Sequence, residues 1–203
     1  MRYIIVGNSF YKTFSKIYKY TEGDYFIGLD EGSLEIIKGG YKLNEAWGDF
    51  DSGNNISFIR ENTTCFHKYP KEKNETDLEL VLMNLNTNDE IIIYDVTGSR
   101  LDHELINILL LKKYKHLNIS LVDELNEIKY YSEINKYHVS QDDYKYISLI
   151  TLDHALISIT KGRYLLSNTL ITSTDTYTTS NEYVDGSFCF DLLDGELVVI
   201  RSK

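Results

Sequence analysis

Residues 91–111 read IIIYDVTGSRLDHELINILLL and contain, in one stretch, the unit from which the first part of the chain is built. Ile91–Val96 is a largely apolar run of strand length, and Thr97–Ser99 forms a polar turn with a central glycine. The apolar residues that follow recur at helical spacing: Leu101, Leu105, Ile108 and Leu109. A strand, a short turn and a helix in this order are typical of a parallel sheet covered by helices on both faces.

The same alternation extends outward from this stretch over the first 125 residues. The helix that starts at Leu101 is expected to end near Leu117, and a second apolar helical stripe is formed by Leu78, Val81, Leu82 and Leu85. Short apolar runs predict further strands at Tyr3–Val6, Tyr25–Leu29, Ile56–Ile59 and Asn118–Val122. We therefore predict an α/β domain over residues 1–125, with a Rossmann-like parallel sheet.

Residues 126–203 differ from the first part, because Tyr, Thr and Ser become frequent and helical spacing disappears. Asp194-Gly195 predicts a hairpin turn between two late strands. The strand-like runs are Ile147–Leu152, Ala155–Ile159, Leu165–Leu166, Thr169–Thr172, Ser187–Leu193 and Leu197–Ile200. Successive strands without intervening helices predict an antiparallel β-sandwich domain.

Acidic residues outnumber basic ones, 31 to 21, which gives a formal net charge of −10 at pH 7. Nucleic-acid phosphates need a Lys/Arg-rich face, so we expect no nucleic-acid partner. A bare nucleotide would also be repelled, so a phosphate site here would need metal ions or clustered cations.

The first apolar run, Tyr3–Val6, is shorter than a signal peptide's apolar region of about 7–15 residues or a membrane span of about 20. The only two cysteines, Cys65 and Cys189, show no CxxC spacing and are expected to be reduced and buried. We therefore expect a cytoplasmic protein without a membrane partner.

The segment Gly48-Asp49-Phe50-Asp51-Ser52-Gly53 places two carboxylates one residue apart between glycines. Mg²⁺ prefers oxygen ligands and often takes one or two carboxylates together with substrate phosphates, so this segment is a candidate metal loop. An acidic, solvated turn is the alternative interpretation of such a short pattern.

The segment Lys73-Asn74-Glu75-Thr76-Asp77 precedes the helical stripe that begins at Leu78. Thr76 and Glu79 have the spacing of a capping box, and an acid in the first turn also suits the helix dipole. Capping does not account for Lys73, and a lysine beside a helix N-terminus is suited to a phosphate. Structural capping and a functional role both remain open for this segment.

The turn after Ile91–Val96 is the third candidate segment, because α/β proteins bind ligands at the carboxyl edge of a parallel sheet. Thr97, Gly98 and Ser99 offer hydroxyl and backbone donors to phosphate, and Arg100 offers a guanidinium fork. A polar turn with Asp102 as a first-turn acid is the alternative, and His103 alone is more often structural. The segment is not a Walker A loop, because the pattern GxxxxGK[ST] is absent.

Taken together and in this order, these segments resemble the thiamine pyrophosphokinase family. That family carries an Asp-Gly-Gly-Ala segment, a G-D-F-D-S loop, K-x-x-T-D and G-G-R-x-D-H at two helix starts, and a late Thr/Ser-Ser-Asn segment. The matching segments are Asp30–Ser33, Gly48–Ser52, Lys73–Asp77, Gly98–His103 and Thr179–Asn181. Lys161–Leu166 also resembles the family's glycine–aromatic–leucine segment, and the resemblance covers nearly the whole chain.

The resemblance implies an enzyme that transfers pyrophosphate from ATP to the hydroxyl of thiamine, with Mg²⁺, giving thiamine diphosphate and AMP. It implies that residues 1–125 form the nucleotide-binding catalytic domain and residues 126–203 a thiamine-binding domain. It also implies a homodimer that binds thiamine where two subunits meet.

Residue roles are likewise implied by the resemblance. The metal-binding acids would be Asp49, Asp51 and Asp77, and the catalytic set adds Arg100 and Asp102. The positions around ATP would be Asp30, Lys73, Thr76, Thr97, Gly98, Ser99 and Arg100. Thiamine would contact Tyr164, Ser180 and Asn181, and either Asp77 or Asp102 would accept the proton of its hydroxyl.

Five positions depart from the family pattern. Glu31 and Ser33 replace a glycine and an alanine, Ser99 replaces the glycine before Arg100, and Asp95 lies where a glycine is usual. Leu165 also stands where the late segment has a proline.

Two other functions fit parts of the pattern. A phosphatase would use Asp49 as a nucleophile, but that nucleophile normally ends an apolar strand, and Asn44–Gly48 does not have an apolar strand pattern. A non-catalytic thiamine- and nucleotide-binding module would keep the pockets without turnover.

Overall fold

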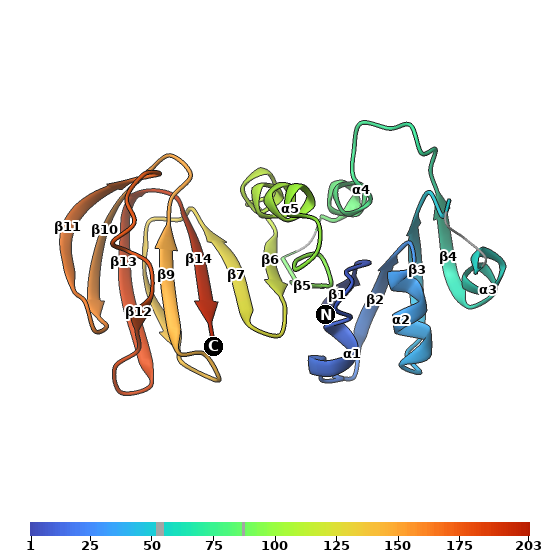
Figure 1. Cartoon of the computed structure of the whole chain (residues 1–203), viewed down its shortest axis with the longest axis horizontal. Coiled ribbons are helices and arrows are strands. Elements are labelled where there is room, and N and C mark those ends of the chain that lie inside the picture. The colour runs from blue at the N-terminus through green and yellow to red at the C-terminus, as the bar shows by residue number, and fades with distance from the viewer. Residues whose placement is uncertain (52–54, 87) are drawn as a thin grey trace. The chain divides into compact units, whose positions relative to one another are not determined.

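The computed structural model describes residues 1–51, 55–86 and 88–203. The chain divides into two compact units, Met1–Glu124 and Leu125–Lys203, and each is described by itself (Figure 1). The first unit is a mixed α/β structure with a parallel sheet, and the second is antiparallel β-structure.

The first unit is built on six parallel strands in the order β6-β5-β1-β2-β3-β4. Because all six strands run the same way, their carboxyl ends meet at one edge of the sheet. The strands are β1 (Arg2–Val6), β2 (Asp24–Leu29), β3 (Leu43–Gly48), β4 (Thr63–Lys68), β5 (Glu90–Tyr94) and β6 (Asn118–Val122).

Both faces of this sheet are buried, as expected for strands that are apolar on successive residues. Ile4 and Phe26 belong to a core cluster on one face, together with Phe14 and Ile36 from two of the helices. The neighbouring residues in the strands alternate to the other face, where Ile5, Ile27, Ile91 and Ile93 are all 1% exposed or less. The helices are α1 (Phe14–Ile17), α2 (Gly32–Lys38), α3 (Ile56–Glu61), α4 (Asp77–Asn84) and α5 (Leu101–Lys113).

The strands at residues 3–6, 25–29, 91–96 and 118–122 and the helices at α4 and α5 are confirmed within a few residues. The strand predicted at Ile56–Ile59 is wrong, because this segment is α3. Ile56 and Ile59 lie one helical turn apart and pack against the same core cluster, while Phe58 is exposed. The prediction missed β3 and β4, whose sequences contain Asn44, Glu45 and His67.

The second unit contains two groups of antiparallel strands, in the orders β12-β9-β14-β7 and β11-β10-β13-β8. Side chains from both groups form one core cluster, including Leu149 and Val199 from the first and Ile157 and Phe190 from the second. The strands are β7 (Asn126–Tyr131), β8 (Asn135–Ser140), β9 (Tyr146–Ile150), β10 (His154–Lys161), β11 (Leu166–Thr172), β12 (Asn181–Glu182), β13 (Ser187–Gly195) and β14 (Leu197–Ser202).

The hairpin predicted at Asp194-Gly195 is wrong. Strand β13 pairs with β10 and β8, whereas β14 pairs with β7 and β9, so the turn leads from one strand group to the other. Gly195 has a φ of 81°, and a Cβ there would lie 2.2 Å from the His154 carbonyl oxygen. The glycine is therefore required because the chain passes close to the backbone of β10 as it leaves β13, and not because of a two-residue hairpin.

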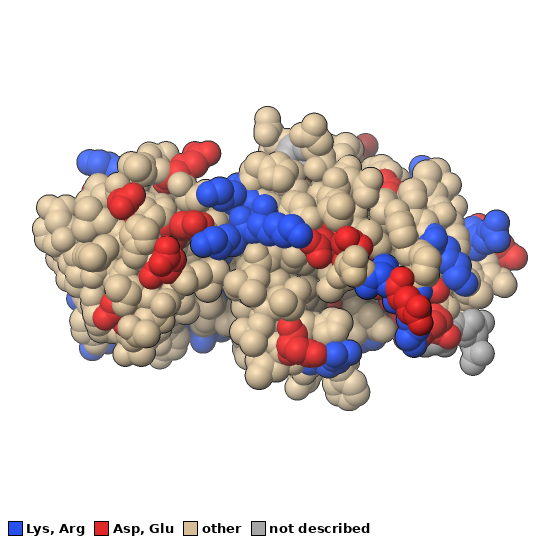
Figure 2. All heavy atoms as spheres, turned by 90° about the horizontal axis from the view of Figure 1, so that it is seen from above, with Lys and Arg blue, Asp and Glu red and all other residues tan. Residues whose placement is uncertain are grey.

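Figure 2 shows basic side chains gathered in one cluster on the face in view, with groups of acidic side chains to either side of it. Among the described residues, no helix is long and apolar enough to cross a membrane. Both cysteines are free thiols, but the expectation that both are buried is wrong. Cys65 is exposed on β4, and Cys189 is half-buried on β13.

Candidate active site

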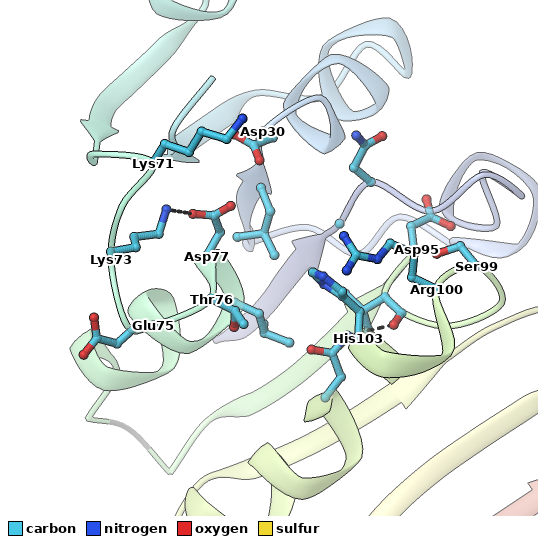
Figure 3. Close-up of a pocket in the computed structure, with 16 residues that line it drawn as sticks. Asp30, Lys71, Lys73, Glu75, Thr76, Asp77, Asp95, Ser99, Arg100 and His103 are labelled. Carbon is cyan, nitrogen blue, oxygen red and sulfur yellow. Dashed lines mark hydrogen bonds and ion pairs between the residues drawn. The ribbon is translucent and has the colours of Figure 1, made fainter. Parts of the chain in front are cut away.

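A cleft of about 400 Å³ opens at the carboxyl edge of the parallel sheet in the first unit (Figure 3). It is bounded by the ends of β1 and β2, by the loop and first turn of α4, and by the loop and first turn of α5. The residues that line it are Gly7, Asn8, Leu29, Asp30, Lys71, Lys73, Glu75, Thr76, Asp77, Leu78, Asp95, Val96, Ser99, Arg100, His103 and Asn107. Three of the segments singled out in the sequence therefore contribute to one cavity.

Carboxylates gather at one side of the cleft. Asp30, directly after β2, accepts a hydrogen bond from the Phe50 backbone N–H at 3.0 Å. Burial, followed by the nearby charge of Asp77, raises the pKa of Asp30 to about 7, and the charge of Asp49 acts in the same direction. Asp49 and Asp77 are therefore each close enough to Asp30 to repel its negative charge.

Lys73 partly neutralises this negative charge. Its Nζ lies 2.6 Å from Asp77 Oδ1, across one turn at the start of α4, and both side chains are mostly buried. Figure 3 shows the pair at one wall of the cleft, with Asp30 and Lys71 nearby. A desolvated lysine next to carboxylates provides a fixed positive charge where the cleft would otherwise be acidic.

The Asp49–Asp51 turn lies beside this group and does not line the cleft directly. Asp49 Oδ1 accepts the Asp51 backbone N–H at 3.0 Å, and the Asp51 carboxylate is paired with Lys71. Phe50 is buried and stacks on Phe66 with ring centroids 4.7 Å apart, which fixes the turn between the two acids. Ser52 and Gly53, which belong to the predicted metal loop, lie outside the described residues.

Gly48 is required by the close approach of β3 to the end of β2. A Cβ at this position would lie only 1.9 Å from Asp30 Oδ1. The glycine in front of the two acids thus makes room for a third carboxylate. Among the described residues, no group of three His, Cys, Asp or Glu side chains is close enough to hold a metal ion by itself.

Thr76 has the capping role predicted for it. Its hydroxyl oxygen accepts the Glu79 backbone N–H at 3.2 Å at the N-terminus of α4. The Glu79 carboxylate instead contacts Lys113 and Tyr114, so it lies away from the cleft. Capping and cleft formation are therefore combined in one turn, since Thr76 and Asp77 also line the cavity.

The loop from Asp95 to Arg100 forms the opposite wall. Asp95 is buried with a φ of 58°, and its carboxylate accepts the backbone N–H groups of Thr13 at 2.5 Å and Phe14 at 3.3 Å. The left-handed backbone explains why a glycine suits this position, and the two N–H groups explain why an aspartate is held here. Burial raises the pKa of Asp95.

The predicted phosphate contacts of this loop are only partly brought to the cleft. Thr97 is buried and its hydroxyl donates to Asp123 at 2.9 Å, while the Gly98 N–H donates to Glu104. Ser99 and Arg100 line the cavity. Arg100 pairs with Asp102 at 2.6 Å on the exposed rim, and this pairing lowers the pKa of Asp102 to about 2.

The predicted thiamine contacts all lie in the second unit. Tyr164 is 56% exposed, and the Arg163 guanidinium lies 5.5 Å from its ring centroid. Asn181 is buried, and its amide side chain both accepts from Tyr164 N at 3.0 Å and donates to Tyr164 O at 2.7 Å. Ser180 is exposed, with a φ of 55°. Asn181 therefore fixes the backbone of Tyr164 and presents little free polar surface.

Several cleft residues were not singled out from the sequence or were given a structural role. Lys71 and Asn8 stood outside the quoted motifs, and His103 was interpreted as structural. Asn107 lies on α5 and donates to the Val96 carbonyl at 2.8 Å, which anchors the 95–100 loop. Its position one turn after His103, on the same helix face, is the only sequence signal that could have indicated it.

Fold and cleft define an α/β protein of the class that binds its ligand at the carboxyl edge of a parallel sheet, here with both acidic and basic side chains lining the cleft. Comparisons with known proteins specify the class further. Residues 18–122 match the family model "Thiamin pyrophosphokinase, catalytic domain", so the chain belongs to the thiamin pyrophosphokinase family of enzymes.

Individual relatives agree over most of the chain. It is 35% identical to the thiamine pyrophosphokinase of Bacillus subtilis over 190 residues, which is 89% of this chain and 88% of that protein. The crystal structure of that enzyme matches with a TM-score of 0.86, at 29% identity over 100% of this chain and 99% of the other. A thiamin pyrophosphokinase family protein from Enterococcus faecalis gives a TM-score of 0.89, at 28% identity and with 100% and 99% coverage.

A phosphatase is not excluded by the residues before Asp49, although they lack an apolar strand pattern in the sequence. Asp49 does follow a strand, β3, whose last residues Ala46, Trp47 and Gly48 are buried. The membership of the thiamin pyrophosphokinase family is what distinguishes this chain from a phosphatase.

Proposed function

We propose that this chain transfers the pyrophosphoryl group of ATP to the hydroxyl of thiamine, giving thiamine diphosphate and AMP in a Mg²⁺-dependent reaction. The observation that carries this proposal is one cleft with two different walls. Asp30, Asp77 and Lys73 form one wall, and Ser99 and Arg100 form the opposite wall. The family membership supplies the reaction class.

Mg²⁺ would be held by Asp49, Asp51 and Asp77, with Asp30 beside them. The fit is supported by Asp30, whose pKa is raised first by burial and then by the neighbouring charges of Asp77 and Asp49. Protein sites for Mg²⁺ commonly contribute one or two carboxylates and leave other positions to water and substrate phosphates, so a complete protein cage is not needed. When bound, the ion would neutralise phosphate charge.

The chain's own residues then bind and orient the substrates. Lys73 and Arg100 would contact phosphate oxygens, and the N-terminus of α4, which lines the cleft, would favour their negative charge. Asp102 is a poor proton acceptor, because its pairing with Arg100 lowers its pKa to about 2. We therefore assign Asp102 to orienting Arg100.

Thiamine recognition is proposed for the second unit. Residues 126–203 would form the thiamine-binding β-sandwich and residues 1–125 the catalytic domain, in a cytoplasmic homodimer that binds thiamine where two subunits meet. Tyr164 and Ser180 are exposed, and the Tyr164 ring is suited to a cationic heterocycle. The net charge of −10 favours the approach of the thiamine cation.

Product analysis after mixing the protein with thiamine, ATP and Mg²⁺ tests the proposal. Thiamine diphosphate with stoichiometric AMP is the expected result. Thiamine monophosphate with ADP would retain the substrate and contradict the pyrophosphoryl transfer. Binding of both substrates without AMP would instead identify the non-catalytic module, and release of inorganic phosphate from ATP without thiamine would identify a phosphatase.

A further inference from the structure

Two aromatic side chains stand exposed beside the cleft and have no role in the site described above. Phe10 is 85% exposed and Tyr11 is 56% exposed, and their rings meet edge to face at 5.7 Å. They lie on the segment between β1 and α1, which begins with the cleft residues Gly7 and Asn8. Exposed neighbouring aromatics at the rim of a cavity are characteristic of ligand sites.

The backbone that carries these rings is hydrogen-bonded to the neighbouring 95–100 loop of the cleft. Buried Ser9 donates its hydroxyl to the Thr97 carbonyl at 2.9 Å, and the Gly7 N–H donates to the Tyr94 carbonyl at 2.9 Å. The far end of the segment is fixed by the bonds from Thr13 and Phe14 to Asp95. Phe10 and Tyr11 are therefore exposed although the backbone that carries them is held at both ends.

Tyr11 is seated directly on the loop that carries Ser99 and Arg100. A Cβ at Gly98 would lie 2.9 Å from Tyr11 Cδ2, so the ring lies against the bare glycine backbone. Gly98 has a φ of 81°, which also favours glycine. The ring thus borders the same loop that supplies two of the cleft-lining residues.

We propose that Phe10 and Tyr11 form the stacking surface for the base of the bound nucleotide, an inference that rests on the proposed function. A base is joined to its phosphates through a single ribose, so it must lie close to the phosphate-binding residues. Aromatic rings bind planar bases by stacking, largely independently of base identity. Thiamine also contains planar rings, but Tyr11 contacts the loop assigned to phosphate, which favours the nucleotide.

The test compares ATP with inorganic tripolyphosphate, which carries a chain of three phosphates but no base. Dissociation constants of both are measured by titration calorimetry with Mg²⁺ and without thiamine, for the wild type and for Phe10→Ala, Tyr11→Ala and the double variant. The double variant is expected to lose about 5- to 100-fold in ATP affinity and to bind tripolyphosphate within about twofold of wild type. Tyr11→Phe should retain ATP affinity.

Tyr20→Ala provides the matched control, because Tyr20 is 60% exposed and stacks on Tyr41 at 5.9 Å, before the amino end of β2. Equal losses for ATP and tripolyphosphate, or no loss for either, would overturn the stacking surface. A raised thiamine KM with unchanged ATP affinity would assign the rings to thiamine and also overturn it. Product formation by the wild type is measured in parallel, so that a failed stacking surface is distinguished from a failed function.

Discussion

The two units treat left-handed backbone in different ways. In the second unit, the non-glycine residues with positive φ are Asp142, Asn168, Ser180 and Asp185, and all are exposed. In the first unit, Phe50 and Asp95 are buried with φ near 50–58°, and Lys12 and Asp30 are partly buried with φ of 49° and 45°. The second unit places these conformations in exposed turns, within β11 for Asn168, and at the proposed thiamine contact Ser180, whereas the first places them at the carboxyl edge of its sheet.

This difference shows where the molecule holds conformations that are unfavourable locally. Asp30 and Asp95 line the cleft, and Phe50 separates Asp49 from Asp51. Strained backbone persists only where the surroundings hold it, and it collects at sites with a function. The first unit is therefore expected to respond strongly to small changes at its edge, and the second unit to respond mainly through substrate affinity.

The largest effect is expected for Asp77→Asn, which removes a charge from the cleft without changing the shape of the side chain. Activity should fall on the order of 100- to 1,000-fold, as for loss of one group that stabilises the transition state. Steady-state kinetics measure this, with circular dichroism to check folding. Glu79→Gln is the matched control on the same helix, because its carboxylate contacts α5 instead. A folded Asp77→Asn protein with normal turnover would contradict the site assignment.

Gly48→Ala tests whether the carboxyl edge of the first unit is sensitive to a small change, and it should reduce both stability and activity. The new Cβ would be forced against Asp30, which we expect to cost more than about 2 kcal/mol of unfolding free energy. Gly40→Ala is the control, since Gly40 has a φ of 78° but no atom within 4 Å, and should cost about 1 kcal/mol. Urea unfolding of both variants measures the difference. Equal losses would show that backbone conformation alone explains the glycine.

Tyr164→Ala tests the second unit. Loss of the ring should raise the thiamine KM about 3- to 30-fold, the range of a partly desolvated cation–π contact, and leave the ATP KM within about twofold. Tyr177→Ala, another half-exposed tyrosine of this unit, should change neither constant. An increase confined to the ATP KM would move nucleotide binding into the second unit and break the comparison.

A final effect is expected in the pH dependence of stability. The pKa of Asp30 is about 7 in the folded protein and about 3.9 in an unfolded chain, so the folded state holds an extra proton between these values. Stability should therefore fall as the pH rises from about 4 to 7. Because Asp30 is only partly buried and screened by solvent, the slope should lie well below the limit of about 1.4 kcal/mol per pH unit for one proton. In Asp30→Asn this contribution should disappear. An unchanged pH profile of urea unfolding would show that Asp30 is ionised throughout.

The sequence allowed the parallel sheet to be predicted where the strands are apolar on successive residues, as in β1, β2 and β5. It failed for β3, because Asn44 and Glu45 interrupt the pattern although Ala46 and Trp47 are buried. It also failed for β7 and β8, where Lys and Asn occupy outward positions. At Ile56–Ile59, four residues were too few to distinguish a strand from one helical turn.

The candidate site was predictable where a segment carries its own chemistry, as with Asp77 beside Lys73. The environment of each group was not predictable, because it depends on contacts between distant segments. Thr97 carried the expected donor, yet Asp123, 26 residues later, accepts its hydroxyl hydrogen. Asn181 matched a substrate-binding segment, but its amide is occupied by the backbone of Tyr164.

The bonds from Asp95 to Thr13 and Phe14 have a consequence for how this chain can change over evolutionary time. Glycine at position 95 would suit the left-handed backbone, but it would leave the N–H of Thr13, a buried residue, without its acceptor. Replacement of Asp95 by glycine should therefore be harmful unless residues 8–14 change with it. The substitution history of position 95 is in this sense tied to a segment 82 residues away in sequence.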